Sequence, residues 1–357
     1  MVRARPAAGA GPLHRIRPSG AACAQGRGQG AWGRSGCLHL RDVRGGDGRI
    51  HPTPAAHACG RPARRLHKCR GRRNGTVGGT AALSALIILL ALLSPAGAIA
   101  GEAVITFLDV GEGEAVLVET PGGKKVLVDT GNLVTGRSVA QALRRRSIDS
   151  LDAVFITHHH PDHMGGVFHL APFIEEALRF DNGVELKAPG CEGDMYRYFA
   201  DLFRTGRYRV PADGEEISFD EVTFHVMRYG GEKRDWNTNS LVIMVRHGGV
   251  RILLMGDGGL ETERYLIEKG VDLRAQLLKV GHHGAADASS EAFIKAVSPR
   301  YAVISIDSGN RRGYPSKEVV ERLRRAGARV LITAERGDIT LRSDGSALKK
   351  ESKGNSD

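Results

Sequence analysis

The pattern of hydrophobic and polar residues changes twice along the chain. Residues 1–75 contain few aliphatic side chains and show no sustained period, so they cannot bury enough apolar surface to offset the entropy of folding. An apolar run follows at 81–93, and from Glu102 onward short apolar segments alternate with turn-forming residues. The pattern predicts four segments: a disordered basic leader (1–76), a signal peptide or single membrane anchor (77–100), a folded domain (101–346) and a disordered tail (347–357).

The folded domain is predicted to combine strands and helices. It opens with strands at 104–110, 115–119 and 125–129, with Pro121-Gly122-Gly123 as a hairpin turn. Further strands are predicted at 153–157, 221–227, 240–246, 251–255, 276–280 and 301–306, helices at 138–146, 260–269, 289–296 and 316–326, and a terminal hairpin at 329–333 and 338–342. Runs of strands with helices between them predict an α+β fold, in which two sheets pack face to face beneath outer helices.

The net charge of +11 is unevenly distributed. Residues 1–80 hold 16 of the 51 Lys and Arg and two of the 40 Asp and Glu, which leaves 35 basic and 38 acidic residues in 81–357. The folded domain is therefore slightly acidic, and any nucleic-acid binding would need a local patch. Two short arginine clusters, Arg144–Arg146 and Arg311–Arg312, are candidates, although ordinary solvated charges are the simpler interpretation.

The apolar run at 81–93 has the features of an export signal. Arginines precede it, and the small residues Ala98 and Ala100 follow, which predicts cleavage after Ala100. The run is shorter than the roughly 20 residues that span a bilayer, although a tether through 81–98 remains the alternative. We therefore expect an exported domain, periplasmic or extracellular, or a membrane-anchored domain on the outside.

The most informative motif is Thr157-His158-His159-His160-Pro161-Asp162-His163, directly after a predicted buried strand. Imidazole nitrogens and carboxylate oxygens are ligands for zinc and similar cations. His158 and His160 are two residues apart and share a direction in an extended segment, whereas Asp162 and His163 suit the turn that follows. The spacing suggests two neighbouring metal positions, with His159 pointing the opposite way. A structural zinc site would normally include cysteine, so a catalytic site is expected.

Three other apolar strands also end in Asp or His beside glycine. These ends are Asp129-Thr130-Gly131, Gly256-Asp257-Gly258 and Gly281-His282-His283-Gly284. A single such residue would more often be a turn or cap residue. Four together indicate one shared site, in which Asp257 could bridge two metals.

These motifs, from about Glu102 to Gly345, resemble the metallo-β-lactamase superfamily, and in particular the C-terminal hydrolase domain of ComEC-type DNA-uptake proteins. The resemblance is carried by the strand-end motifs above together with Phe107–Glu114 and Asn237–Leu241. It implies a four-layer αββα sandwich with two divalent metal ions between the sheets, zinc or alternatively manganese. A bridging hydroxide would attack an electrophilic phosphorus or carbonyl carbon.

The resemblance also implies a role for each site residue. His158 and His160 would bind one metal, Asp162 and His163 the other, and Asp257 would bridge them. His282 would join the second metal, with His283 as the competing choice, and Asp129 would orient a ligand. Three catalytic roles are hypotheses: Asp162 as a proton acceptor, Lys279 facing developing negative charge, and Asn239 contacting substrate, for which a turn or cap role is the alternative.

The expected activity is hydrolysis of a phosphodiester, in a small molecule or a nucleic acid, with no obligate protein partner. Many superfamily members have a further metal-binding histidine where this chain has Asn237–Ser240, which would leave the first metal with fewer protein ligands. Hydrolysis of a lactam, lactone or thioester is the alternative. A di-iron redox protein is a third possibility, which His160 disfavours because such proteins usually carry a carboxylate within the motif.

Overall fold

The computed structural model describes residues 101–351 except 112, 186, 188 and 231–234. The chain divides into two units, Met1–Asn74 and Gly75–Asp357, and all described residues belong to the second. The predicted leader and the predicted signal or anchor therefore lie outside the described residues. Within the described ranges, no helix has the length and apolar character required to cross a bilayer.

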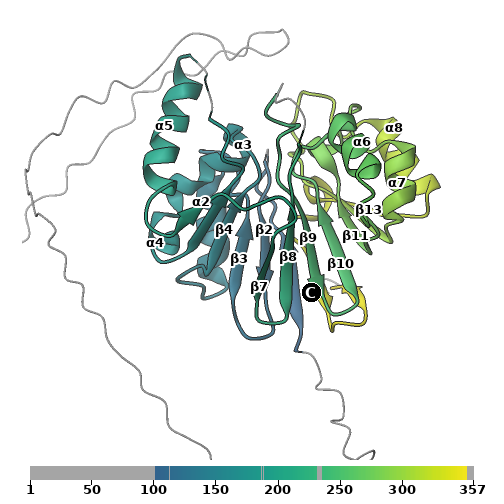
Figure 1. The fold of residues 1–357 in the computed structure, drawn as a ribbon, viewed down its shortest axis with the longest axis horizontal. Coiled ribbons are helices and arrows are strands. Elements are labelled where there is room, and N and C mark those ends of the chain that lie inside the picture. The colour runs from purple at the N-terminus through teal and green to yellow at the C-terminus, as the bar shows by residue number, and fades with distance from the viewer. Residues whose placement is uncertain (1–100, 112, 186, 188, 231–234, 352–357) are drawn as a thin grey trace, which may run out of the picture. The chain divides into compact units, whose positions relative to one another are not determined.

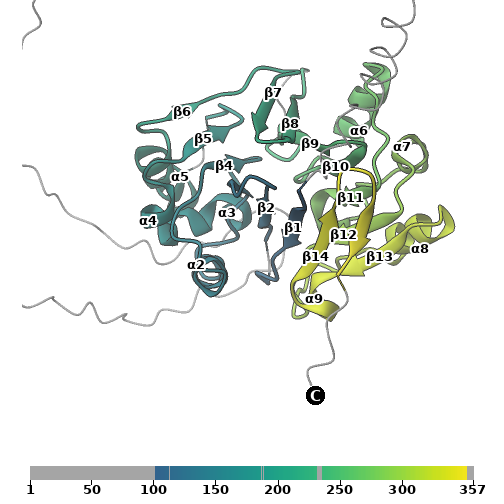
Figure 2. The ribbon, with the colours of Figure 1, turned by 90° about the horizontal axis from the view of Figure 1, so that it is seen from below.

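Two mixed sheets form the centre of the domain (Figures 1 and 2). The eight-stranded sheet has the order β15-β14-β1-β2-β3-β4-β5-β6. Its strands are β1 (Ala103–Phe107), β2 (Val116–Glu119), β3 (Lys125–Val128), β4 (Ala153–Ile156), β5 (Leu178–Asp181), β6 (Tyr208–Arg209), β14 (Ile339–Ser343) and β15 (Leu348–Lys350). The seven-stranded sheet has the order β13-β12-β11-β10-β9-β8-β7. Its strands are β7 (Glu216–Phe219), β8 (Val222–Met227), β9 (Val242–His247), β10 (Val250–Leu254), β11 (Leu277–Lys279), β12 (Tyr301–Ile304) and β13 (Arg329–Ile332).

Helices cover the outer face of each sheet, so the domain has four layers (Figure 1). Those over the eight-stranded sheet are α2 (Gly136–Arg145), α3 (Pro161–Met164), η1 (Gly165–His169), α4 (Ala171–Ile174) and α5 (Cys191–Phe203). Those associated with the seven-stranded sheet are α6 (Leu260–Glu268), η2 (Gly281–Gly284), α7 (Glu291–Val297) and α8 (Lys317–Arg325), and α9 (Thr333–Arg336) precedes β14. The predicted αββα sandwich is confirmed.

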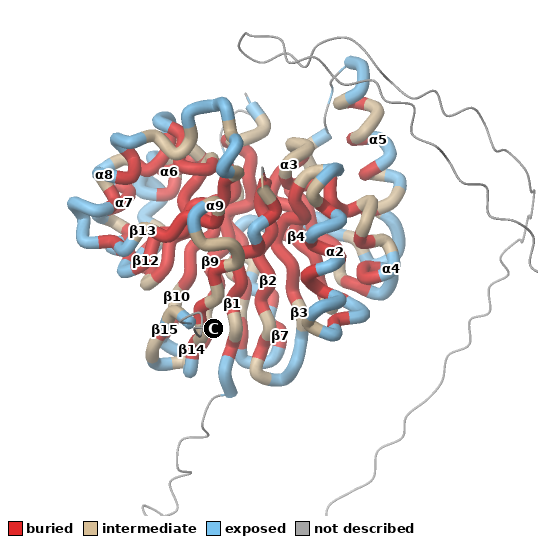
Figure 3. The backbone as a smooth tube through the Cα atoms, turned by 180° about the vertical axis from the view of Figure 1, so that it is seen from behind, coloured by how far each residue is buried: buried red, intermediate tan, exposed pale blue. Residues whose placement is uncertain are grey.

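Strand alternation explains this layering, because successive side chains point to opposite faces of a sheet. In β11, Leu277 packs in the core between the two sheets, while Leu278 packs beneath the outer helices. In β4 the same division places Phe155 inside and Val154 outside. Both sheets are therefore apolar on both faces, and Figure 3 shows the buried residues concentrated in the strands.

Parallel pairing places the site motifs at one edge of each sheet. β3 pairs with β4, and β10 with β11, in parallel. Because parallel strands end on the same side, the residues that follow β3 and β4 lie together, as do those that follow β10 and β11. The predicted hairpin turn at Pro121–Gly123 is confirmed, because β2 and β3 pair antiparallel. β1 with β2, and β9 with β10, are also antiparallel pairs.

Two predictions about the C-terminal region are wrong. The strands at 329–333 and 338–342 do not form a hairpin, because β13 pairs with β12 in one sheet and β14 pairs with β1 in the other. The intervening α9 carries the chain between the sheets, a change that an apolar pattern alone cannot reveal. The predicted disordered tail begins too early, because residues 348–350 form β15 and pair with β14.

Candidate metal centre

The loop after β4 and the short helix α3 bring four predicted ligands to the edge of the eight-stranded sheet. His158 Nε2 lies 2.9 Å from His160 Nδ1 and 3.7 Å from Asp257 Oδ2. Pro161 begins α3, so the chain turns immediately after His160 and presents Asp162 and His163 from the helix. The expected change of direction between these two pairs is therefore present.

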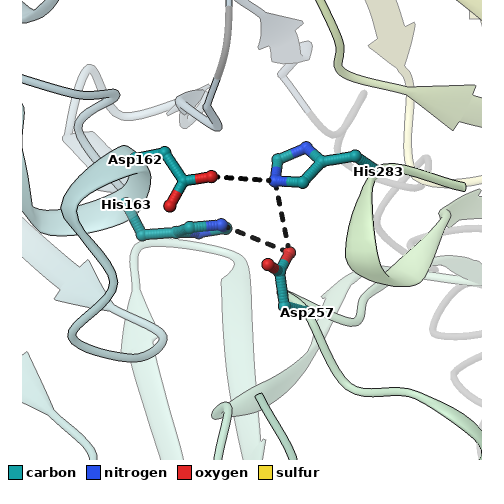
Figure 4. Close-up of side chains that lie close together, drawn as sticks. All are labelled: Asp162, His163, Asp257 and His283. Atoms are coloured by element: carbon teal, nitrogen blue, oxygen red, sulfur yellow. Dashed lines mark ion pairs between the residues drawn. The ribbon is translucent and has the colours of Figure 1, made fainter. Parts of the chain in front are cut away.

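Asp162, His163, Asp257 and His283 form a second convergent group (Figure 4). His163 Nε2 lies 3.2 Å from Asp257 Oδ1, and His283 Nε2 lies 3.5 Å from the same oxygen and 3.4 Å from Asp162 Oδ2. The groups His158–His160–Asp257 and Asp162–His163–Asp257–His283 each offer ligand atoms within 4.8 Å of one another. Asp257 belongs to both groups, which is the position expected of a bridging carboxylate.

The ligand atoms themselves indicate that a cation fits this cluster. His163 Nε2, Asp257 Oδ1 and His283 Nε2 are buried and make no hydrogen bond to another described residue. Buried polar atoms of this kind are rare in folded proteins, and metal coordination is one way to satisfy them. Nitrogen and carboxylate donors without a thiolate match zinc or manganese chemistry.

Burial and charge hold His158, His160 and Asp257 in suitable protonation states. Burial lowers the pKa of His158 well below its usual range and also lowers the pKa of His160. Burial alone would raise the pKa of Asp257, but His163 and His283 outweigh it and hold that pKa well below the ordinary value. Neutral imidazoles and ionised carboxylates are the forms that bind metals. For His163, burial lowers the pKa, but Asp257 and Asp129 outweigh it and raise that pKa well above its usual range.

Asp129 orients His163 through the ring nitrogen that does not face Asp257. Its carboxylate accepts hydrogen bonds from Thr157 N and Thr157 Oγ1 at 2.7 Å each, and its Oδ2 lies 2.7 Å from His163 Nδ1. This contact leaves Nε2 of His163 directed toward Asp257. The arrangement has the geometry of a carboxylate–histidine–metal series, as expected for Asp129.

The two neighbouring histidines of η2 make different contacts. His283 Nδ1 lies 2.8 Å from the carbonyl oxygen of Ser305, which turns its Nε2 into the cluster. His282 instead lies with Nδ1 2.9 Å from Asp287 Oδ1 and Nε2 3.3 Å from Asn237 Nδ2, outside both groups. Both residues have positive φ, 46° and 51°, a conformation that costs energy for residues other than glycine. The structure therefore places His283, rather than His282, among the convergent atoms.

Lys279 does not point toward the metal-ligand cluster, so the prediction that it faces developing negative charge is wrong. Its side chain is fully buried, and Nζ lies 2.6 Å from Glu114 Oε2. The reason is strand alternation: Lys279 shares the inner face of β11 with Leu277 and so points between the sheets.

Asn239 also differs from the catalytic expectation. Its Nδ2 donates to the carbonyl oxygen of Asp235 at 2.6 Å, which is the turn role that was the alternative. Asn237 is the residue of this turn that reaches the site, through its contact with His282.

Two contributors were missed by reasoning from the sequence alone. Asp181 ends β5 and lies 3.1 Å from His159 Nε2, so the middle histidine of the motif is held on the side away from the cluster. Glu114 lies within 4.8 Å of Asp129 and His163. Asp181 stands at the end of a strand two residues before Gly183, which is the same signal that identified the ligands. Glu114 lies beside Gly113 in the loop between β1 and β2, where that signal does not apply.

Comparison with known proteins gives the family. The model of the metallo-beta-lactamase superfamily matches residues 108–308. Competence protein ComA of Neisseria gonorrhoeae is 31% identical over 235 residues, which cover 65% of this chain and 31% of that protein. A UPF0173 metal-dependent hydrolase of Roseiflexus castenholzii is 42% identical over 194 residues, 52% of this chain and 76% of that protein.

Among solved structures, the metallo-beta-lactamase fold protein YhfI from Bacillus subtilis aligns with 68% of this chain and 100% of its own length, at 12% identity and a TM-score of 0.48. The chain spans about a third of the length of the competence-type relatives that it matches. The expected resemblance is confirmed by the family model and these relatives. The chain belongs to the metallo-beta-lactamase superfamily and is a metal-dependent hydrolase of that family.

Proposed function

We propose that the chain hydrolyses phosphodiesters at a centre of two divalent cations. The observation that carries this proposal is the position of Asp257 in both convergent groups. A shared carboxylate allows two cations to lie close enough to act on one substrate, the arrangement common in enzymes of phosphoryl transfer. Support also comes from the relative named Competence protein ComA and from the resemblance of the motifs to ComEC-type DNA-uptake proteins.

Each group would hold one cation. His158, His160 and Asp257 would bind the first, and Asp162, His163, His283 and Asp257 the second. When bound, the cations would supply Lewis acidity and would lower the pKa of a bound water, the source of the hydroxide nucleophile that the family resemblance implies. Zinc is the proposed metal, with manganese as the alternative.

The residues around the cluster would restrict and orient the substrate. The Trp236 ring lies 4.9 Å from the ring of His160, and the Tyr314 ring lies 5.5 Å from that of His282. Both aromatic side chains are partly exposed and offer stacking surfaces beside the cluster. Asp162 would accept a proton through its second carboxylate oxygen, since Oδ2 lies 3.4 Å from His283 Nε2.

The test is an assay of the full 357-residue chain with zinc or manganese. The substrates are a bis-aryl phosphodiester, single-stranded DNA and a chromogenic β-lactam. Cleavage of either phosphodiester, lost in His158→Ala and retained in His225→Ala, supports the proposal, because His225 lies on β8 outside both groups. Cleavage of the lactam alone would favour a carbonyl substrate. Metal analysis showing two irons and a visible absorption band would favour redox chemistry instead.

We also propose that the domain acts outside the cytoplasm, either exported or tethered through 81–98. The support is the apolar run with its arginine flank and small residues. N-terminal sequencing of the protein recovered from periplasmic and membrane fractions tests this. A mature N-terminus at Gly101 supports cleavage, and an intact protein in the membrane fraction supports the tether.

A further inference from the structure

A lysine and a glutamate face each other between the two sheets, beside the metal-ligand cluster. Glu114 lies just before β2 in the eight-stranded sheet, and Lys279 is the last residue of β11 in the seven-stranded sheet. Their charged atoms are 2.6 Å apart, and both side chains are fully buried. Burying two charges is costly, and a well-packed apolar pair often stabilises a protein core equally well. Stability alone therefore does not account for this ion pair.

The main chain of Glu114 is fixed to the turn that carries Asp162 and His163. Glu114 N donates to the carbonyl oxygen of Asp162 at 3.2 Å, and Gly131 N donates to the carbonyl oxygen of Glu114 at 2.8 Å. The approach is close, because a Cβ on Gly113 would lie 2.4 Å from the Asp162 carbonyl oxygen. A shift of Glu114 must therefore be transmitted to this half of the cluster.

Lys279 is tied to the other half in a similar way. Its Nζ donates to the carbonyl oxygen of Val280 at 2.9 Å, and the chain then enters η2, which carries His283. A Cβ on Gly281 would lie 2.2 Å from the carbonyl oxygen of Gly258, so η2 packs directly on the loop that carries Asp257. Lys279 thus belongs to the rigid unit that presents Asp257 and His283.

We propose that the Glu114–Lys279 ion pair is a positioning pair that sets the separation of the two halves of the metal centre. It draws the unit of Asp162 and His163 toward the unit of Asp257 and His283, so that their ligand atoms meet within coordination distance. This inference rests on the proposed two-metal function. In this inference, Glu114 and Lys279 act through the metal ligands and not on the substrate.

The test compares metal binding in three full-length proteins: the wild type, the double variant Glu114→Gln with Lys279→Met, and Ser343→Ala. The double variant removes both charges and so leaves no buried charge without a partner. Ser343→Ala is the matched control, because Ser343 Oγ lies 2.9 Å from His247 Nδ1 and also joins the two sheets. That contact is buried and lies at the opposite end of the strands, since His247 pairs with Val250 at the start of β10.

The readouts are metal stoichiometry and affinity, by competition with a chelator, and the visible spectrum of the cobalt-substituted protein. We expect the double variant to bind the second cation about 10- to 100-fold more weakly, the range found when supporting residues around a metal site are lost, with a changed cobalt spectrum. Ser343→Ala should match the wild type in both. A folded double variant with wild-type affinity and spectrum would overturn the inference.

A second variant keeps the inference testable if the double variant does not fold. Glu114→Asp preserves the charge but withdraws the carboxylate by one methylene, so it should weaken binding of the second cation about 10-fold, the low end of the range for supporting residues. Wild-type affinity in Glu114→Asp would then refute the positioning role. Fewer than two cations in the wild type would overturn the two-metal proposal and this inference with it, whereas two cations in the wild type and tight binding in both variants would overturn the inference alone.

Discussion

The two sheets contribute to the metal centre in different ways. The eight-stranded sheet presents His158, His160, Asp162 and His163 from one short stretch after β4. The seven-stranded sheet presents Asp257 and His283 from separate loops after β10 and β11. The first half is determined by local spacing, and the second depends on the parallel pairing of two strands. The local motif therefore indicates a metal site, but the number of cations that this site can hold depends on the tertiary fold.

Asp257 is the point where the two halves depend on each other most. In Asp257→Asn, both convergent groups lose their shared carboxylate, so we expect phosphodiesterase activity to fall on the order of 1000-fold, as when a principal charge-stabilising group is removed. Metal content should fall from two cations per chain to one or none. Asp287→Asn is the control, because that carboxylate is 65% exposed and lies outside both groups. Equal losses in the two variants would contradict the bridging role.

Substitutions of the two histidines of η2 test the ligand that sequence spacing alone cannot assign. We expect His283→Ala to lose one cation and about 100-fold in activity, because its Nε2 lies within 3.5 Å of both Asp162 and Asp257. His282→Ala should keep two cations and change mainly KM, because His282 contacts Asp287 and Asn237 at the edge of the site. Metal analysis and steady-state kinetics distinguish these outcomes. Loss of a cation in His282→Ala, with two retained in His283→Ala, would reverse the assignment.

A substitution at Asp129 tests how strongly the ligands that follow β4 depend on a supporting residue. Asn at this position can still accept the hydrogen bond from Thr157 N, but its amide nitrogen cannot accept one from His163 Nδ1. We expect Asp129→Asn to weaken cation binding about 10- to 100-fold while retaining the fold. Chelator competition measures the affinity, and circular dichroism checks the fold. Wild-type affinity in this variant would show that His163 needs no such partner.

The sequence predicted the local half of the site more completely than the tertiary half. His158, His160, Asp162 and His163 share one stretch, so alternation and the turn at Pro161 were enough to place them. Sequence spacing cannot decide between His282 and His283, because the two are adjacent and lie together between the same strand and Gly284. The choice depends on positive φ values and on a carbonyl oxygen from Ser305, neither of which leaves a pattern in the sequence.

The same limit applies to the fold. Strands with clear boundaries, such as β3, β4 and β10, were predicted within a residue or two. The helix α5 and the strands β5 and β7 were missed, and β13 and β14 were wrongly joined, because apolar spacing does not identify the sheet to which a strand belongs. Lys279 was misplaced for a related reason: its partner, Glu114, is remote in sequence and belongs to the opposite sheet.

The smallest expected effect concerns the support behind the motif loop. Asp181 accepts a hydrogen bond from Arg204 Nε at 2.8 Å and from Tyr208 Oη at 2.8 Å, and its Oδ2 lies 3.1 Å from His159 Nε2. Burial would raise the pKa of Asp181, but His159 and Arg204 outweigh it and lower the pKa to about 2. Asp181→Asn should therefore lower the free energy of unfolding by about 2 kcal/mol at pH 7. Metal stoichiometry should not change, because Asp181 lies outside both convergent groups.

The pH dependence of this effect is specific to Asp181. Its folded-state pKa lies below the unfolded value of about 4, so the ionised carboxylate stabilises the fold fully above pH 4, and this stabilisation is lost as the pH falls toward 2. Denaturant titrations of wild type and Asp181→Asn should therefore differ most above pH 4 and converge near pH 2. Arg251, whose ion pair with Asp272 is at the surface, provides the control: Arg251→Gln should change stability by less than about 1 kcal/mol at pH 7. A constant difference between wild type and Asp181→Asn down to pH 2 would mean that packing, rather than the charge of Asp181, anchors the motif loop.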